Sequence, residues 1–153
     1  PLSVAVGTPD VMGSWPRTTG EALHTATYLG HPVACAVGTA AIDILVDEGL
    51  AERSQKMGAF AQECLKQHLG DLAQVGTIRG RGLMVGIPLL DAEGRPSSKL
   101  ASAVTHSALA AGILVLGSGP GGHVLSLTPP LSIPEALLEW GIERLAQCIR
   151  ENV

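Results

Sequence analysis

The stretch Val75-Gly76-Thr77-Ile78-Arg79-Gly80-Arg81-Gly82-Leu83-Met84-Val85-Gly86-Ile87-Pro88-Leu89-Leu90 decides the fold, because the periodicity of apolar residues changes there. Before it, apolar residues recur at spacings of three and four, as they do on one face of a helix. Within it, they form short runs that are typical of strands, and the glycines of Gly80-Arg81-Gly82 favour a tight connection. The sequence therefore predicts two strands, over 75–79 and 83–90, around that connection.

Two helices are predicted ahead of this stretch. Pro32 suits the first turn of a helix, and residues 33–48 are rich in alanine and aliphatic side chains on nearly every face. We expect such a helix to be buried, because no polar face remains for solvent. After Gly49 an amphipathic stripe predicts a surface helix that ends near Gly70. Further upstream, residues 2–6 alternate as in a strand.

Downstream of the central stretch, the sequence predicts a second set of alternating elements. Ser97 or Ser98 can cap a helix that runs to Ala111, and Pro134 with Glu135 begins the last helix. A turn over 91–96 is predicted before the first of these helices. Two strands, over 113–116 and 123–128, are predicted between the helices, with a glycine-rich loop over 117–122 joining the strands. This order predicts a compact α/β layer from about residue 70, with long helices that connect it to an earlier part of the protein.

Composition excludes several classes of protein. The 153 residues carry a net charge of −4, and the aromatic residues are two tryptophans, one tyrosine and one phenylalanine. This balance argues against binding of a phosphate backbone or of stacked single-stranded bases, so no nucleic-acid partner is expected. No run of 18 apolar residues predicts a membrane span. Three widely spaced cysteines suit buried thiols in a reducing compartment, which predicts a cytoplasmic protein.

No self-contained catalytic or metal site stands out from spacing alone. The glycines at 80, 82 and 86 are followed by a strand, whereas a dinucleotide-binding turn leads into a helix. Gly117–Gly122 likewise lacks a following helix, which favours a hairpin loop over a phosphate cradle. His24, His31 and Cys35 do not have the spacing of zinc ligands, so no metal is expected.

Residues 24–35, His24-Thr25-Ala26-Thr27-Tyr28-Leu29-Gly30-His31-Pro32-Val33-Ala34-Cys35, resemble the His-x-x-Thr-Tyr-x-Gly-Asn-Pro-x-Ala-Cys motif of class III aminotransferases. These are pyridoxal-phosphate enzymes of fold type I, among them the acetylornithine, ornithine and 4-aminobutyrate aminotransferases. Residues 1–7, 75–86 and 124–133 resemble three further motifs of the family, in the same order. Four motifs in order are far more specific than any one of them.

The resemblance implies a fold class and a division of the chain. The fold would be α/β (α+β), the C-terminal small domain of a fold type I pyridoxal-phosphate-dependent transferase. That domain is a small, mostly antiparallel sheet with helices packed on one face, preceded by long connecting helices. Residues 1–31 would be the tail of the large cofactor-binding domain, residues 32–69 the connecting helices, and residues 70–153 the small domain.

The resemblance also implies roles for single residues. Thr27 matches a threonine that contacts the cofactor phosphate of the partner subunit in a homodimer, and Tyr28 shapes the same cofactor-binding loop. The Schiff-base lysine of the family lies a few residues before the position of Pro1. We therefore expect no catalytic residue in this chain, and no activity from the chain alone.

Ser126 stands where many family members have an arginine that binds the substrate carboxylate. The resemblance therefore places Ser126 on the substrate side, and a serine there leaves the amino donor and acceptor open. Arg79 and Arg81 are interpreted as residues of surface or interface salt bridges, with contact to an anion as the alternative.

The implied activity of the whole protein is transfer of an amino group from an amine or amino acid to a 2-oxo acid, with pyridoxal 5'-phosphate as cofactor. Two alternatives stay open. The same scaffold serves pyridoxal-phosphate decarboxylases, aminomutases and racemases. A non-enzymatic role, as a small α/β binding or dimerisation module, is the other.

Overall fold

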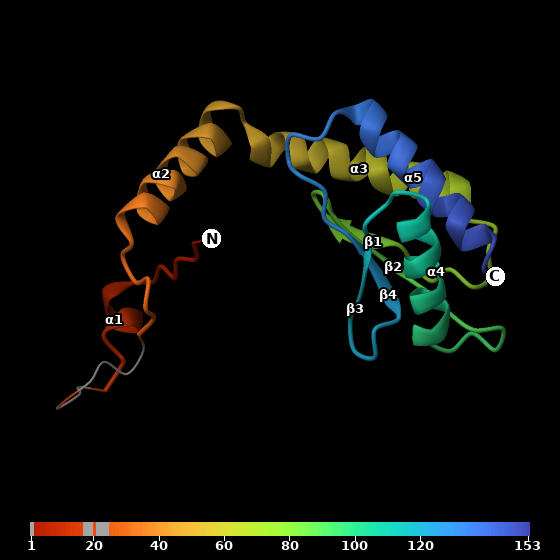
Figure 1. The fold of residues 1–153 in the computed structure, drawn as a ribbon, viewed down its shortest axis with the longest axis horizontal. Helices are drawn as coiled ribbons and strands as arrows, with labels where there is room; N and C mark the ends of the chain where they lie inside the picture. The colour runs from red at the N-terminus through yellow and green to blue at the C-terminus, as the bar shows by residue number, and fades with distance from the viewer. Residues whose placement is uncertain (1, 17–19, 21–24) are drawn as a thin grey trace. The chain divides into compact units, whose positions relative to one another are not determined.

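The structure, a computed structural model, describes residues 2–16, 20 and 25–153. It consists of two compact units, Pro1–Glu48 and Gly49–Val153, which are shown in Figure 1. The described residues of the first unit form the helices α1 (Pro9–Met12) and α2 (Pro32–Asp47). The second unit contains three longer helices and one sheet.

In the first unit, both helices begin at a residue whose side chain accepts a backbone hydrogen bond. The Thr8 hydroxyl accepts from the Val11 N–H at 3.4 Å, and His31 Nδ1 accepts from the Ala34 N–H at the same distance. The predicted helix over 33–48 is confirmed as α2. The predicted strand over 2–6 is wrong, because no described segment of this unit pairs with it and a lone strand leaves its N–H and C=O groups without partners.

Helix α2 differs from expectation in its exposure. None of its residues is buried, and Val33, Val37 and Ile42 are each about two-thirds exposed. An apolar surface of this kind on a helix indicates a face that another protein surface covers.

The second unit is an antiparallel sheet with helices on one face (Figure 1). Its strands are β1 (Arg79–Arg81), β2 (Met84–Pro88), β3 (Leu116–Ser118) and β4 (Val124–Leu127), in the order β1-β2-β4-β3. The helices are α3 (Leu50–Leu69), α4 (Ser98–Ala110) and α5 (Glu135–Arg150). Helix α3 packs against α5, β1 and β2, and α4 packs against α5, β3 and β4. The expected small antiparallel α/β domain is thereby confirmed.

Prolines explain why two strands differ from their predicted bounds. Residues 75–78 were expected in the first strand, but they make only an isolated bridge between Val75 and Leu89, because Pro88 has no N–H to continue the ladder. The strand predicted over 113–116 instead occupies Leu116–Ser118. Beyond β4 the sequence continues into Pro129 and Pro130, which cannot extend a ladder toward residues 113–115.

The core lies between the sheet and the helices. Its largest fully buried side chains come from every layer and are Leu65, Leu69, Val85, Ile87, Leu89, Val104, Leu125, Ile142, Leu145 and Ile149. At one end of this core, Arg150 Nε donates to the His68 carbonyl at 3.1 Å. The Arg150 guanidinium also donates to the Asp71 carboxylate, and these hydrogen bonds hold the pKa of Asp71 below its ordinary value. Arg150 thus joins the C-terminal ends of α3 and α5.

Two glycines allow a close approach between helix α3 and the sheet. A Cβ at Gly58 in α3 would lie 2.0 Å from the Gly82 carbonyl oxygen, in the turn between β1 and β2. Gly82 itself has a φ of +53°, which favours glycine. The neighbouring Leu83 N–H donates to Ser54 Oγ at 3.1 Å, so this turn is fixed to α3 by contact and by hydrogen bond.

We expect Gly58→Ala to lower the free energy of unfolding by about 1–3 kcal/mol, because the added methyl group forces the turn away from α3. The matched control is Gly141→Ala in the middle of α5, where a Cβ would meet no atom within 4 Å. That change should stabilise the protein by about 0.5–1 kcal/mol through the entropy of the unfolded chain. Urea unfolding of both variants checks this, and equal effects at the two sites would contradict the close contact.

Candidate functional site

Ser126 lies on an inner strand of the sheet, where the register places it in a row of four residues. It pairs with Gly86 of β2 on one side and with Leu116 of β3 on the other. Gly86 in turn pairs with Arg79 of β1. Residues directly opposite each other on neighbouring antiparallel strands point to the same face. Arg79, Gly86, Ser126 and Leu116 therefore share one face of the sheet, in that order.

This face is the one turned away from the helices. The alternate residues Val85, Ile87 and Leu125 are at most 1% exposed and belong to the core. On the opposite face, Met84 is 68% and Leu116 is 65% exposed, and Ser126 is partly exposed. The residues of this row therefore lie on the surface of the second unit.

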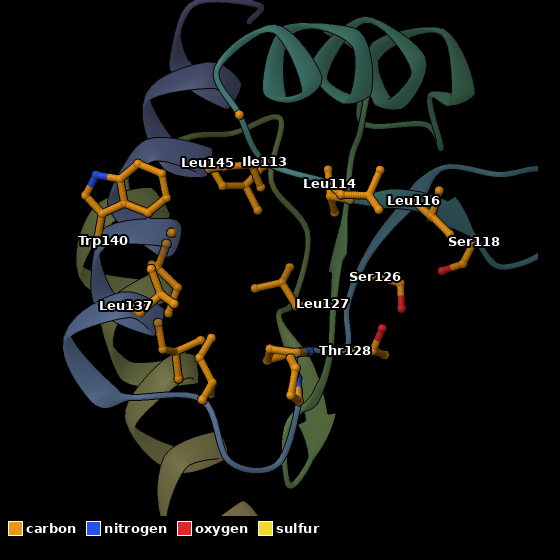
Figure 2. A pocket seen from close by; sticks show the side chains of 18 of the residues that line it. Ile113, Leu114, Leu116, Ser118, Ser126, Leu127, Thr128, Leu137, Trp140 and Leu145 are labelled. Carbon is orange, nitrogen blue, oxygen red and sulfur yellow. The ribbon is translucent and has the colours of Figure 1, made fainter.

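A cavity of about 590 Å³ opens beside β3 and β4 (Figure 2). Helix α5 supplies Leu137, Trp140 and Leu145 on one side, and the segment before β3 supplies Ile113 and Leu114. Figure 2 shows the hydroxyl groups of Ser118, Ser126 and Thr128 together at the edge formed by the strands. The cavity therefore has apolar walls and one hydroxyl-bearing edge.

Two of these hydroxyl groups are available for a ligand. Ser118 Oγ donates to the Val124 carbonyl at 3.1 Å. Neither Ser126 nor Thr128 forms a side-chain hydrogen bond with another residue in the described part of the chain. The Arg53 guanidinium donates to the Leu131 and Ile133 carbonyls and so fixes the chain that leaves β4.

Thr27 and Tyr28 lie in a turn of the first unit. The turn is closed by hydrogen bonds from the Leu29 N–H to the Ala26 carbonyl at 3.0 Å and from the His31 N–H to the Tyr28 carbonyl at 3.1 Å. Tyr28 is 77% exposed, and its ring meets the edge of the His31 ring with 5.8 Å between centroids. The Thr27 hydroxyl forms no hydrogen bond within the described residues, so it can donate to a ligand.

The turn also explains one departure from the resembled motif. The motif has asparagine where this chain has His31. His31 Nδ1 accepts the backbone hydrogen bond at the start of α2, which is a role that asparagine also fills at helix N-termini. The substitution therefore keeps the helix start. His24 lies outside the described residues.

The interpretation of Arg79 and Arg81 as salt-bridging residues finds no partner within the second unit. The ion pairs there join Arg95 to Asp91 and Glu93, and Arg150 to Asp71. Within the described part of the chain, neither Arg79 nor Arg81 forms an ion pair or a side-chain hydrogen bond.

The other candidate groups also have defined surroundings. Cys148 is buried and Cys64 half-buried, where burial raises the pKa of the Cys64 thiol. Cys35 is exposed, which corrects the expectation of three buried thiols.

The described residues contain no group of three histidine, cysteine or acidic side chains that could hold a metal ion. None of the described helices combines the length and the apolar character that crossing a bilayer requires.

Comparison with known proteins decides the family. A sequence profile described as "Aminotransferase class-III" matches residues 1–149. The chain belongs to the class III aminotransferase family. It is 33% identical to a 2-aminoadipate transaminase of Pseudomonas putida, over 99% of this chain and 36% of that protein. It is 31% identical to a leucine/methionine racemase of Thermococcus litoralis, over 99% of this chain and 33% of that protein.

The fold agrees with solved structures of aminotransferases. An aminotransferase from Bacillus anthracis superposes with a TM-score of 0.77 and is 30% identical, over 88% of this chain and 32% of that one. The chain spans about a third of the length of the curated relatives that it matches. It therefore represents one part of the class III architecture.

Motifs could identify Thr27, Tyr28 and Ser126 as candidates, but not the surroundings of Ser126. The row from Arg79 to Leu116 depends on how the strands pair. Alternation of apolar and polar residues within one strand does not show which residue of a distant strand lies opposite it. The cavity beside Trp140 depends on the gap between residues 113–115 and the end of β4. The only signal for that gap in the sequence is the proline pair after β4.

Proposed function

We propose that this chain is the C-terminal part of a pyridoxal-phosphate-dependent class III aminotransferase. The whole enzyme moves an amino group from an amine or amino acid to a 2-oxo acid. The match of the family profile over residues 1–149 carries the proposal. The relatives are about three times as long as the chain, which supports placing the Schiff-base lysine and the rest of the cofactor pocket in other parts of the polypeptide.

The turn at Thr27 has the chemistry that a cofactor phosphate needs. A phosphate dianion is bound well by neutral hydroxyl and N–H donors as well as by cations. The Thr27 hydroxyl is without a partner among the described residues, and Tyr28 stands beside it, largely exposed. When bound, pyridoxal phosphate withdraws electrons from the amino-bearing carbon of the substrate. In this proposal Thr27 holds the phosphate and Tyr28 shapes the loop around it.

Exposed apolar residues on α2 support the proposal of a homodimer. Val33, Val37 and Ile42 need a covering surface, and the turn that carries Thr27 leads directly into this helix. In a homodimer, Thr27 would contact the phosphate bound by the partner subunit.

We propose a cytoplasmic location on the ground that all three cysteines are free thiols.

A racemase is the second candidate, because one relative of similar identity is a leucine/methionine racemase. A racemase inverts one amino acid without an acceptor, whereas an aminotransferase requires a 2-oxo acid. Incubation of the full-length protein with L-leucine, with and without 2-oxoglutarate, distinguishes the two by the appearance of D-leucine or of a new amino acid.

The first test of the proposed function is cofactor attachment. We expect the full-length protein to bind pyridoxal phosphate with a visible absorbance band and to be labelled at one lysine by borohydride reduction. Residues 1–153 alone should give neither a stable band nor amino transfer, because the reactive lysine is not among Lys56, Lys66 and Lys99. Specific labelling of one of these three lysines would refute this assignment.

The second test concerns Thr27. We expect Thr27→Val in the full-length protein to weaken pyridoxal phosphate binding about tenfold or more, because a hydrogen bond to a charged oxygen is lost. The matched control is Thr25→Val, two residues earlier in the same exposed segment, which should change the affinity less than twofold. Titration of the apoprotein with the cofactor measures both, and equal affinities in the two variants would remove Thr27 from the phosphate site.

A further inference from the structure

The turn that carries Thr27 is joined to helix α2 at His31. The His31 N–H donates to the Tyr28 carbonyl at 3.1 Å, and the His31 carbonyl accepts the Cys35 N–H at 3.0 Å. The backbone of His31, with φ −56° and ψ 120°, is not helical, as is usual for the residue that precedes a helix. One residue thus closes the turn on one side and accepts the first hydrogen bond of α2 on the other.

The side chain of His31 completes this junction. The first N–H groups of a helix lack an intrahelical acceptor. At the start of α2, Pro32 has no N–H, and His31 Nδ1 accepts the Ala34 N–H at 3.4 Å. The Tyr28 and His31 rings stand at 75° to each other, with 5.8 Å between centroids, and this contact restricts the orientation of the imidazole.

The hydrogen bond to Ala34 depends on the protonation state of His31. An imidazole that accepts at Nδ1 is neutral and carries its one proton on Nε2. Protonation turns both ring nitrogens into donors, which leaves the Ala34 N–H without its acceptor. It also places a positive charge at the N-terminal end of a helix, which is the positive end of the helix dipole. Both effects act in the same direction and loosen the junction.

No acidic side chain among the described residues compensates a charge on His31. Tyr28 is the titratable side chain that the preceding turn places against the ring, and Cys35 lies one turn further along α2. None of the described acidic residues of the first unit forms an ion pair with the imidazole; they are Asp10, Asp43, Asp47 and Glu48. Histidine side chains change charge between about pH 8 and pH 5.

We propose that His31 is a positioning residue for the cofactor: its neutral imidazole holds the turn in the form that presents Thr27 to the phosphate, and its protonation releases that turn. The proposal rests on the proposed function, in which Thr27 binds the phosphate. The affinity for a ligand falls in proportion to the fraction of protein in the binding-competent form. Loss of a helix cap is enough to lower such a fraction about threefold to tenfold. The affinity for pyridoxal phosphate therefore falls in acid solution through His31.

Two substitutions separate the two nitrogens of the ring. The side-chain oxygen of asparagine stands at the same number of bonds from Cβ as Nδ1 of histidine, whereas the glutamine amide stands one bond further out, as Nε2 does. His31→Asn therefore keeps an acceptor for the Ala34 N–H that does not titrate in this range of pH. His31→Gln is the matched control, because it is equally polar and uncharged but lacks an acceptor at that position.

The measurement is the dissociation constant of pyridoxal phosphate from the full-length protein at about pH 8 and about pH 5.5. At the higher pH we expect the wild type and His31→Asn to agree within about twofold, and His31→Gln to bind about threefold to tenfold more weakly. At the lower pH we expect the wild type to weaken to the level of His31→Gln, while His31→Asn stays tighter than both. Comparison at one pH removes the titration of the cofactor phosphate and of the reactive lysine, which all three proteins share.

Two outcomes of this titration would overturn the proposal. One is a ratio of wild-type to His31→Asn affinity that is the same at both pH values, because the junction would then not titrate. The other is a wild type that binds more tightly than His31→Asn in acid solution, because the charged imidazole would then attract the phosphate instead of releasing the turn.

Hydrogen exchange keeps this inference distinct from the proposed function. If Thr27→Val leaves the affinity unchanged, the phosphate site at Thr27 is wrong, and exchange at the Ala34 amide of the cofactor-free full-length protein decides the role of His31. After correction for the intrinsic effect of pH, we expect protection of this amide to fall about threefold to tenfold on acidification in the wild type and to persist in His31→Asn. A loss of equal size in both proteins would overturn the titrating junction.

Discussion

The pairing of β2 with β4 is the constraint on which the second unit depends. Its register directs Val85, Ile87 and Leu125 into the core and Gly86 and Ser126 to the opposite face. A shift of one residue would exchange the two faces, which would expose the core side chains and bury Ser126. Burial of that apolar set therefore fixes the outward row as firmly as it fixes the core.

Contacts with α3 and α5 hold this pair of strands in place. Gly58 allows α3 to approach the turn at Gly82, where Ser54 accepts the Leu83 N–H. On the other side, Arg53 donates to two carbonyls of the chain between β4 and α5. Helix α3 thus positions both ends of the sheet. Within the second unit, the described helices all pack on the opposite face of the sheet.

The sequence predicted the helices better than the strands. The helix over 50–70 and the break at Gly49 are confirmed, because an amphipathic stripe is a local property and Gly49 adopts a φ of +58°. Strand bounds depend on partners that are remote in sequence, and prolines at 88, 129 and 130 shorten the ladders in ways that hydrophobicity does not reveal. The strand expected over 2–6 is absent for the same reason, since no described partner pairs with it.

The surroundings of the candidate site also depend on residues that are remote in sequence, so the sequence could not predict them. Motifs named Thr27, Tyr28 and Ser126, but the neighbours of Ser126 became visible only with the register of the sheet. Arg79 was interpreted as a salt-bridging residue, but it forms no ion pair within the described part of the chain. Membership of the class III aminotransferase family rests on the sequence, which matches the family over residues 1–149.

A crystal structure of the full-length protein with pyridoxal phosphate and a bound amino acid would test the central claim most directly. We expect β2 and β4 to keep the pairing of Gly86 with Ser126, and we expect the Thr27 hydroxyl to lie about 2.5–2.7 Å from a phosphate oxygen of the cofactor. A register shifted by one residue, or a cofactor phosphate that Thr27 does not touch, would contradict this account.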